Sequence, residues 1–140
     1  MISVIISTHG MFSEEILKSA EMIFGNQENV GTVTFKPGEG VDNLIEKYNK
    51  LINELDCTDG VLFMVDLFGG SPFNAASIIA MKHDNMEIVA GVNLPMILET
   101  LGSRDFSSLS ELLAIAENSG KEAIRVLTKN IETDIEDEMI

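Results

Sequence analysis

The sequence predicts a doubly wound α/β fold, in which helices cover both faces of a parallel sheet. Short, nearly apolar runs rich in β-branched residues recur along the chain and are typical of strands buried on both faces. Amphipathic segments with a 3.6-residue period lie between these runs. A chain of 140 residues has the size of a single domain, and its alternation of strands and helices requires right-handed crossovers between parallel strands.

The first half of the chain contains two pairs of a strand and a helix. Residues 2–7 have the composition of a buried strand, and the helix after it is expected to begin at the N-cap Ser13 and to stop at Gly25. Residues 30–35 predict a second strand. Apolar residues between Val41 and Leu55 then recur at helical spacing without a break, which predicts the second helix.

The second half repeats this alternation. The expected elements are a strand at 61–65, a helix capped by Ser71 with Pro72 at its first position and running to about Lys82, a strand at 87–90, a helix starting at Pro95, and a helix that begins at Ser107 or Ser108 and ends before Gly120. Residues 122–128 favour a further strand at a sheet edge, which would invite pairing with another subunit. Five of the eleven residues in 130–140 are acidic and predict a solvated tail, so the domain is assigned to residues 1–129.

The charge balance narrows the class of partner. Acidic residues outnumber basic ones by 23 to 9, and the formal net charge is −14. Such a chain repels nucleic acid and anionic lipid, so its expected partner is a basic protein surface. Cys57 is the single cysteine, no apolar run has the ~20 residues that a spanning helix needs, and the first residues lack the basic start of a signal peptide. We therefore expect a soluble cytoplasmic protein.

Three loops follow expected strands and share one rim of the sheet, where ligands of open parallel sheets bind. They are residues 8–10, 66–71 and 91–93. If the first and third strands are neighbours, as in flavodoxin-like sheets, His9 and Asp66 lie within reach of one another. A carboxylate bound to an imidazole fixes its tautomer and leaves the other ring nitrogen exposed as a nucleophile or base.

A small anion would fit beside this pair. The turn Gly69-Gly70-Ser71 can point backbone N–H groups outward, and the helix that starts near Pro72 presents the positive end of its dipole. A nucleophilic imidazole next to an anion cradle predicts a histidine that accepts a phosphoryl group. Phe68 and Met11 flank this place and are expected to be exposed.

Other interpretations of the same residues stay open. Each part alone also occurs as an ordinary loop or capping residue, and His83 is expected to be a surface residue without function. A flavodoxin-like module would bind a nucleotide or flavin at this rim, although the chain has no Trp and its one Tyr lies on a helix. A hydrolase would use Ser71, His9 and Asp66 as a triad, although Ser71 lacks the Gly-x-Ser-x-Gly turn and Pro72 removes an N–H from the oxyanion hole.

The motifs at these positions also resemble a known family. In chain order they are Ser7-Thr8-His9-Gly10, Ala20-Glu21-Met22, Glu28-Asn29-Val30, Val65-Asp66-Leu67-Phe68-Gly69-Gly70-Ser71-Pro72-Phe73-Asn74 and Gly91-Val92-Asn93-Leu94-Pro95-Met96. Over about residues 2–128 the chain is similar to enzyme IIA of the mannose family of the bacterial phosphoenolpyruvate-dependent sugar phosphotransferase system.

The resemblance implies a role for each part of the rim. His9 would be phosphorylated on Nε2 by the phosphocarrier HPr and would pass the group to a histidine of a IIB component, with Asp66 orienting the imidazole. The residues implied to hold the phosphoryl oxygens are Ser71 and the backbone amides of Leu67, Gly69 and Gly70. Some relatives have Thr at position 67, so only the backbone of Leu67 is expected to contribute here. No cofactor or metal is implied.

The resemblance also implies a quaternary arrangement. The family fold is a four-stranded parallel sheet in the order 2-1-3-4, plus an antiparallel edge strand exchanged across a homodimer, for which residues 122–128 are the candidate. The chain resembles a stand-alone IIA, which would associate only indirectly with the membrane components IIC and IID. Because sugar specificity in this system resides in the membrane components, the resemblance does not identify the sugar.

Overall fold

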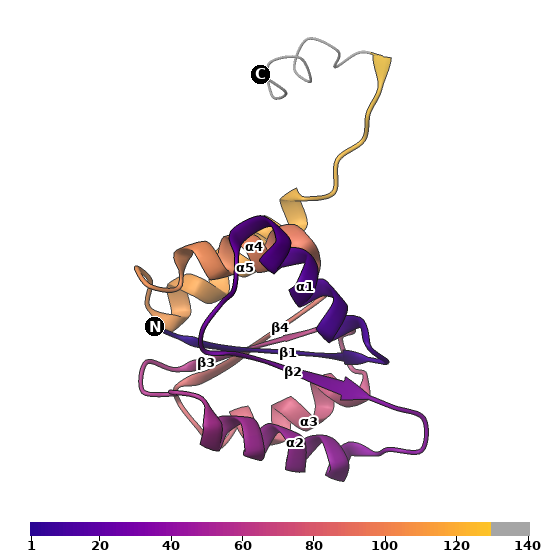
Figure 1. Cartoon of the computed structure of the whole chain (residues 1–140), viewed down its shortest axis with the longest axis vertical. Helices are drawn as coiled ribbons and strands as arrows, with labels where there is room; N and C mark the ends of the chain where they lie inside the picture. The colour runs from indigo at the N-terminus through magenta and orange to yellow at the C-terminus, as the bar shows by residue number, and fades with distance from the viewer. Residues whose placement is uncertain (130–140) are drawn as a thin grey trace.

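A parallel sheet of four strands in the order β2-β1-β3-β4 forms the centre of the molecule (Figure 1). The strands are β1 (Ser3–His9), β2 (Val30–Phe35), β3 (Val61–Val65) and β4 (Met86–Ala90). The computed structural model describes residues 1–129, and the predicted tail at 130–140 lies outside them. The doubly wound α/β class and the strand order 2-1-3-4 are confirmed.

Five helices in the described part of the chain cover the two faces of the sheet. They are α1 (Phe12–Phe24), α2 (Val41–Glu54), α3 (Ser71–Ala80), α4 (Leu94–Ser103) and α5 (Leu109–Glu122). Figure 1 shows α1, α4 and α5 above the sheet and α2 and α3 below it. No helix of residues 1–129 is long and apolar enough to cross a bilayer.

The central strands β1 and β3 explain the nearly apolar runs of the sequence. Every residue of β3, and every residue of β1 except His9, is buried. Successive side chains point to opposite faces. Ile6 therefore packs in the core under α1, α4 and α5, whereas Ile5 packs with Tyr48 and Phe63 in the core above α2 and α3.

Two predicted helix caps are wrong. Ser13 does not cap α1, which begins one residue earlier, because its buried hydroxyl donates a hydrogen bond to the carbonyl of Val33 at 2.9 Å. The backbone N–H of Ser13 instead finds its acceptor in the hydroxyl of Thr8, at 2.7 Å. Ser71 is the first residue of α3 rather than its cap, because Gly70 occupies the cap position in an extended conformation.

Several predicted boundaries shift by a few residues. The helix α3 ends at Ala80 rather than Lys82, β4 begins at Met86, and α4 begins at Leu94 rather than Pro95. Ser108 caps α5, as one of the two predicted alternatives stated.

The predicted end of the last helix before Gly120 is also wrong, since α5 continues to Glu122. A Cβ atom at position 120 would lie 2.5 Å from Cε of Met96. Gly120 therefore lies within α5, where this helix packs closely on the side chain of Met96 in α4, and not at a helix end.

The predicted strand at 122–128 is not present within the single chain. Glu122 is the last residue of α5, and residues 124–128 have no regular structure. The apolar side chains of this segment, Ile124, Val126 and Leu127, are 81%, 69% and 76% exposed. Pairing of this segment with a second copy stays a prediction, because the structure describes one copy of the chain.

Candidate active site

His9 and Asp66 lie side by side at one rim of the sheet. His9 is the last residue of β1, and Asp66 directly follows β3. The two strands are hydrogen-bonded neighbours, with Ser7 opposite Val65. Oδ2 of Asp66 lies 3.0 Å from Nδ1 of the His9 ring and also accepts the backbone N–H of His9 at 3.0 Å. The predicted contact between these two side chains is therefore confirmed.

The contact assigns the proton on the imidazole. A carboxylate oxygen only accepts hydrogen bonds, so Nδ1 of His9 carries a hydrogen, and in the neutral ring Nε2 then has the free lone pair. Nε2 makes no hydrogen bond with any residue of the described chain, and the side chain is 46% exposed. Phe35 contacts the ring edge-on at a centroid distance of 5.6 Å. The exposed ring nitrogen is thus held in a fixed direction.

The loop between β3 and α3 closely approaches the other edge of this ring. A Cβ atom at Gly70 would lie 3.0 Å from Cε1 and 3.6 Å from Nε2 of His9. Gly69, one residue earlier, has a φ of 82°, in the left-handed region that favours glycine. Glycine at these two positions lets the loop turn tightly and place its backbone against the imidazole.

The same loop offers free hydrogen-bond donors. Within residues 1–129 the backbone N–H groups of Leu67, Phe68 and Gly69 donate no hydrogen bond, and neither does the Ser71 hydroxyl. The N–H of Ser71 is the first of α3 and has no acceptor within the helix. Free amides at a helix N-terminus favour an anion.

Gly70 differs from the prediction for this loop. Its N–H donates to the carbonyl of Leu67 at 3.3 Å and is therefore engaged within the turn. Asn74 also contributes here, since its side-chain amide donates to the carbonyl of Gly69 at 3.1 Å and braces the loop from the first turn of α3. The sequence motif contains Asn74, but nothing in its spacing indicated this hydrogen bond.

A fourth loop reaches the same rim and carries a cation that the sequence analysis did not consider. His9 lies opposite Phe35 in the parallel register of β1 and β2, and the N–H of Gly10 donates to the Phe35 carbonyl at 2.8 Å. Lys36 directly follows Phe35, and its ammonium group makes no ion pair within the described residues. Lys36 could have been predicted from the sequence, because the carboxyl ends of parallel strands share one rim and Lys36 follows β2.

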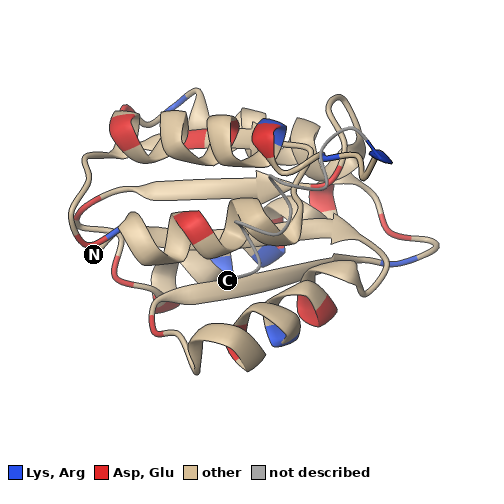
Figure 2. Cartoon of the chain, turned by 90° about the horizontal axis from the view of Figure 1, so that it is seen from above, with Lys and Arg blue, Asp and Glu red and all other residues tan. Residues whose placement is uncertain are grey.

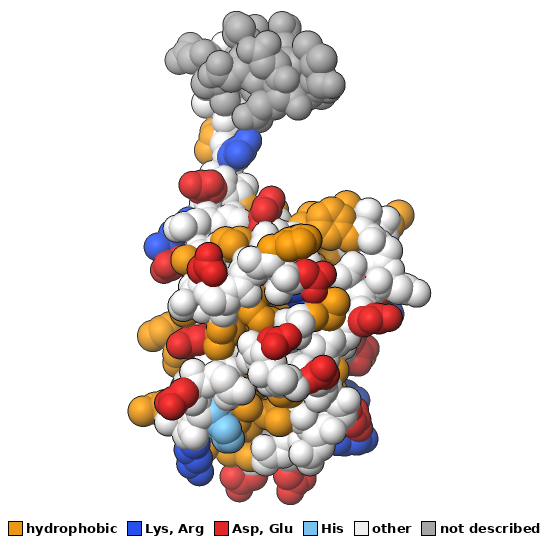
Figure 3. All heavy atoms as spheres, turned by 90° about the vertical axis from the view of Figure 1, so that its left-hand side faces the viewer, with side chains coloured by type: hydrophobic (Ala, Val, Ile, Leu, Met, Phe, Trp, Pro, Cys, Tyr) orange, Lys and Arg blue, Asp and Glu red, His pale blue; other side chains and the backbone are white. Residues whose placement is uncertain are grey.

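Acidic residues outnumber basic ones over the chain. Figure 2 shows Asp and Glu positions on helices and loops around the chain, and Figure 3, which faces the opposite rim where the strands begin, has more red than blue side chains. Among residues 1–129, no three or more His, Cys, Asp or Glu residues are grouped closely enough to hold a metal ion.

The remaining candidates have structural contacts. Asn93, at the predicted third loop, caps α4 by accepting the N–H of Met96 at 3.0 Å and donates to the carbonyl of Gly120 at 3.0 Å. His83 lies beyond the far end of α3, exposed, with Nδ1 3.0 Å from the carbonyl of Ile79. The predicted exposure of Met11 and Phe68 is confirmed at 48% and 78%.

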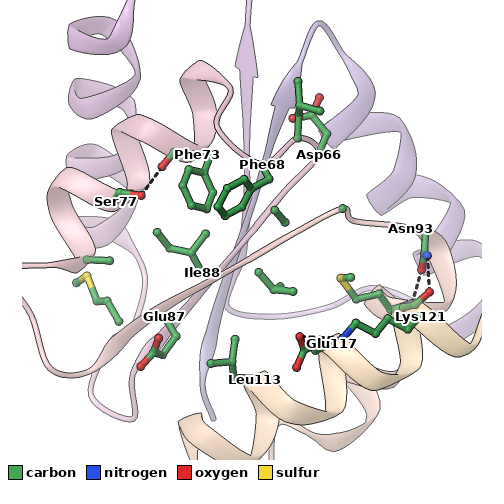
Figure 4. A pocket seen from close by; sticks show the side chains of 18 of the residues that line it. Asp66, Phe68, Phe73, Ser77, Glu87, Ile88, Asn93, Leu113, Glu117 and Lys121 are labelled. Carbon is green, nitrogen blue, oxygen red and sulfur yellow. Dashed lines mark hydrogen bonds and ion pairs between the residues drawn. The ribbon is translucent and has the colours of Figure 1, made fainter.

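A groove of about 1060 Å³ runs along the free edge of β4, next to the rim (Figure 4). Phe68 and Phe73 lie on its α3 side, and Leu113 and Glu117 lie on its α5 side. Asp66 lines one end of the groove, but His9 does not line it. This groove is therefore adjacent to the exposed imidazole and separate from it.

Comparisons with known proteins agree on one family. A family model described as "PTS system fructose IIA component" matches residues 3–117. The chain is 52% identical over 127 residues to the "PTS system mannose-specific EIIAB component" of Escherichia coli K12, which covers 90% of this chain and 39% of that protein. It thus spans about two fifths of the length of that relative. It is 40% identical over 132 residues to the "PTS system fructose-specific EIIA component" of Bacillus subtilis, covering 94% of this chain and 90% of that protein.

Solved structures give the same result. A phosphotransferase system component EIIA from Streptococcus agalactiae superposes with a TM-score of 0.82 at 30% identity, over 90% of this chain and 97% of that one. A "Mannose/sorbose specific IIA subunit" from Enterococcus faecalis superposes with a TM-score of 0.83 at 28% identity, over 91% and 95%.

Proposed function

Because this chain belongs to the EIIA-man family of sugar phosphotransferase system components, we propose that it is a phosphocarrier that receives a phosphoryl group from HPr on His9 and passes it to a IIB component. The observation that carries this proposal is the exposed Nε2 of an imidazole whose Nδ1 is bound by Asp66, beside the free amides that precede α3.

The transfer is an in-line displacement at phosphorus. The Nε2 lone pair of His9 forms the new N–P bond while the N–P bond to the donor imidazole breaks and returns its electron pair to the donor nitrogen. Nδ1 keeps its proton, so positive charge develops on the His9 ring and is stabilised by Asp66 at 3.0 Å. The phosphoryl oxygens accept hydrogen bonds from Ser71 and from the amides of Leu67 and Gly69. The reverse sequence of steps delivers the group to the IIB histidine.

A carrier site must release what it binds. Four loops meet at the rim, and Lys36 is the cation that they contribute, since the residues of 8–10, 66–71 and 91–93 include no Lys or Arg. A site with many cations would hold the phosphoryl dianion too firmly to transfer it. Hydrogen bonds from backbone amides fit a reversible role because they orient the group without a full opposing charge.

The proposed partners fit the exposed surface. A chain with a net charge of −14 favours encounter with a basic surface around the donor histidine, at a rate that falls as salt rises. The free edge of β4, the groove along it and the exposed Ile124, Val126 and Leu127 support a homodimer in which this segment of each copy pairs with β4 of the other. Contact with the membrane components IIC and IID would be indirect, through IIB.

The test is phosphorylation in a reconstituted system. The full chain is incubated with phosphoenolpyruvate, enzyme I and HPr, and its intact mass is measured before and after acid treatment. We expect one acid-labile phosphoryl group on the wild type and on His83→Ala, and none on His9→Ala. The pair is a matched control, because these are the two histidines of the chain. An unmodified wild-type mass, or a phosphoryl group retained in His9→Ala, would overturn the proposal.

A further inference from the structure

We propose that Tyr48 is a positioning residue of this site, because its buried hydroxyl ties the strand that ends at His9 to the helix whose N-terminus faces the imidazole. This inference rests on the proposed phosphoryl transfer at His9. Tyr48 belongs to α2 and does not itself reach the rim, so it would act through the two elements that it joins.

The hydroxyl of Tyr48 makes two hydrogen bonds. It lies 2.6 Å from the hydroxyl oxygen of Ser7 and 2.9 Å from the carbonyl oxygen of Pro72. A carbonyl only accepts, so Tyr48 donates to Pro72. The single Tyr48 hydrogen is then used, and Ser7 must donate to the Tyr48 oxygen. The result is one directed chain of hydrogen bonds from β1 through α2 to the first turn of α3.

Both ends of this chain adjoin the site. Ser7 lies two residues before His9 on the same face of β1, because side chains alternate along a strand. Pro72 directly follows Ser71 in α3. The spacing between strand and helix is already tight, since a Cβ atom at Gly70 would lie 3.0 Å from the ring of His9. A small shift of α3 relative to β1 therefore changes where the amides stand relative to Nε2.

Packing alone does not require this hydroxyl. The Tyr48 ring is fully buried in an apolar core and packs edge-on against Phe63 at a centroid distance of 5.3 Å. A phenyl ring would fill the same space, and a hydroxyl in such surroundings is unfavourable unless its hydrogen bonds are made. Burial raises the pKa of Tyr48 well above its ordinary value, and the hydrogen bond from Ser7 opposes this only in part. The hydroxyl thus stays protonated and keeps donating to Pro72.

The test removes the hydroxyl and keeps the ring. In single-turnover transfer from phosphorylated HPr, we expect Tyr48→Phe to lower the maximal rate about tenfold, since sub-ångström misplacement of reacting groups has effects of this size. The HPr concentration at half-maximal rate should not change, because Tyr48 is remote from the surface. Ser7→Ala breaks the same chain and should act alike. The double variant should be no slower than the slower single variant, since the chain can be broken only once.

Ser3→Ala is the matched control. Ser3 lies on the same face at the opposite end of β1, and its buried hydroxyl oxygen lies 3.0 Å from the carbonyl oxygen of Asp56 and 3.2 Å from that of Gly60, which share its one hydrogen. Its loss should lower the melting temperature without changing the transfer rate. In ¹⁵N spectra of the His9 imidazole, Tyr48→Phe should shift the ring signals and Ser3→Ala should leave them unchanged.

The outcomes separate the two proposals. If the wild type is phosphorylated and the folded Tyr48→Phe variant transfers at the same rate, the role of Tyr48 is overturned. The proposed function of His9 is then unaffected. Ring signals that respond equally to Ser3→Ala and Tyr48→Phe also overturn the role of Tyr48, because the effect would then be one of general stability. A folded wild type that accepts no phosphoryl group overturns the proposed function itself, and the ring signals then still decide whether Tyr48 positions the imidazole.

Discussion

A methyl group at position 70 should disturb phosphoryl transfer with little effect on stability. Gly70 caps α3 with a φ of −74° and a ψ of 171°, which alanine adopts without strain. The added Cβ would lie 3.0 Å from Cε1 of His9, which is closer than carbon atoms ordinarily approach, and 3.6 Å from Nε2. The ring must therefore shift by a few tenths of an ångström, or the loop must move outward.

The expected size of the effect follows from these distances. The His9 ring is held by Asp66 on one side and by Phe35 on another, so a shift lengthens the contact between Nδ1 and Oδ2 or displaces the amides of the loop. We expect single-turnover transfer to Gly70→Ala to fall between about tenfold and about a hundredfold. Loss of a favourable cap residue costs about 0.5–1 kcal/mol, and the smaller entropy of the unfolded chain offsets a similar amount. The free energy of unfolding in urea should therefore change by less than about 1 kcal/mol.

Gly40 supplies the control for this experiment. It is the cap residue of α2, also in an extended conformation, and a Cβ atom there would meet nothing within 4 Å. Gly40→Ala should share the small change in unfolding free energy and leave the transfer rate unaltered. Equal transfer rates for Gly70→Ala and the wild type would refute the conclusion that this loop packs against the acceptor ring.

Three further predictions concern the charges of the site and the end of the domain. Asp66→Asn should keep the fold and the contact with His9 but remove the negative charge, so single-turnover transfer should slow by about tenfold or more. An unaltered rate would show that Asp66 only supports the local structure. Lys36→Gln should shift the phosphorylation equilibrium toward HPr by less than about fivefold at low salt, and intact mass should show no shift at high salt, because salt screens an exposed charge. A shift that persists at high salt would contradict a purely electrostatic role of Lys36. A chain ending at Ala123 should sediment as a monomer and one ending at Lys129 as a dimer; a stable dimer of the shorter chain would exclude pairing through residues 124–128.

The sequence predicted the contact between His9 and Asp66 because that contact depends on topology alone. Both residues end apolar strands, and one assumption about neighbouring strands brings them together. The same reasoning would have included Lys36, which directly follows β2 at this rim. The boundaries of β1 and β3 could also be predicted from the sequence, because both strands are buried along almost their whole length and are therefore nearly apolar.

The roles of Ser13 and Gly120 could not be predicted, since each depends on a partner far along the chain, and the same is true of the hydrogen bond from Asn93 to Gly120. Ser13 is of a residue type that often caps helices, but its hydroxyl donates a hydrogen bond to the carbonyl of Val33, twenty residues away. Gly120 resembles a helix end, but it lies within α5 and packs against Met96 on a neighbouring helix. Local propensity cannot distinguish these uses, because the competing contact arises only after the helices pack.

The position of the groove relative to His9 distinguishes a site for a small substrate from a site for a partner protein. Enzymes that bind small substrates enclose them, and the largest apolar hollow is the usual first candidate for such a site. Here the groove of about 1060 Å³ follows the free edge of β4, and His9 lies outside it, 46% exposed. An enclosed imidazole could not be approached in line by the imidazole of another protein, since two folded surfaces must meet before the nitrogen atoms do. An exposed rim with one oriented ring nitrogen and a few free amides is therefore the geometry that the proposed transfer between proteins requires, whereas the groove is suited to the proposed pairing with a segment of extended chain.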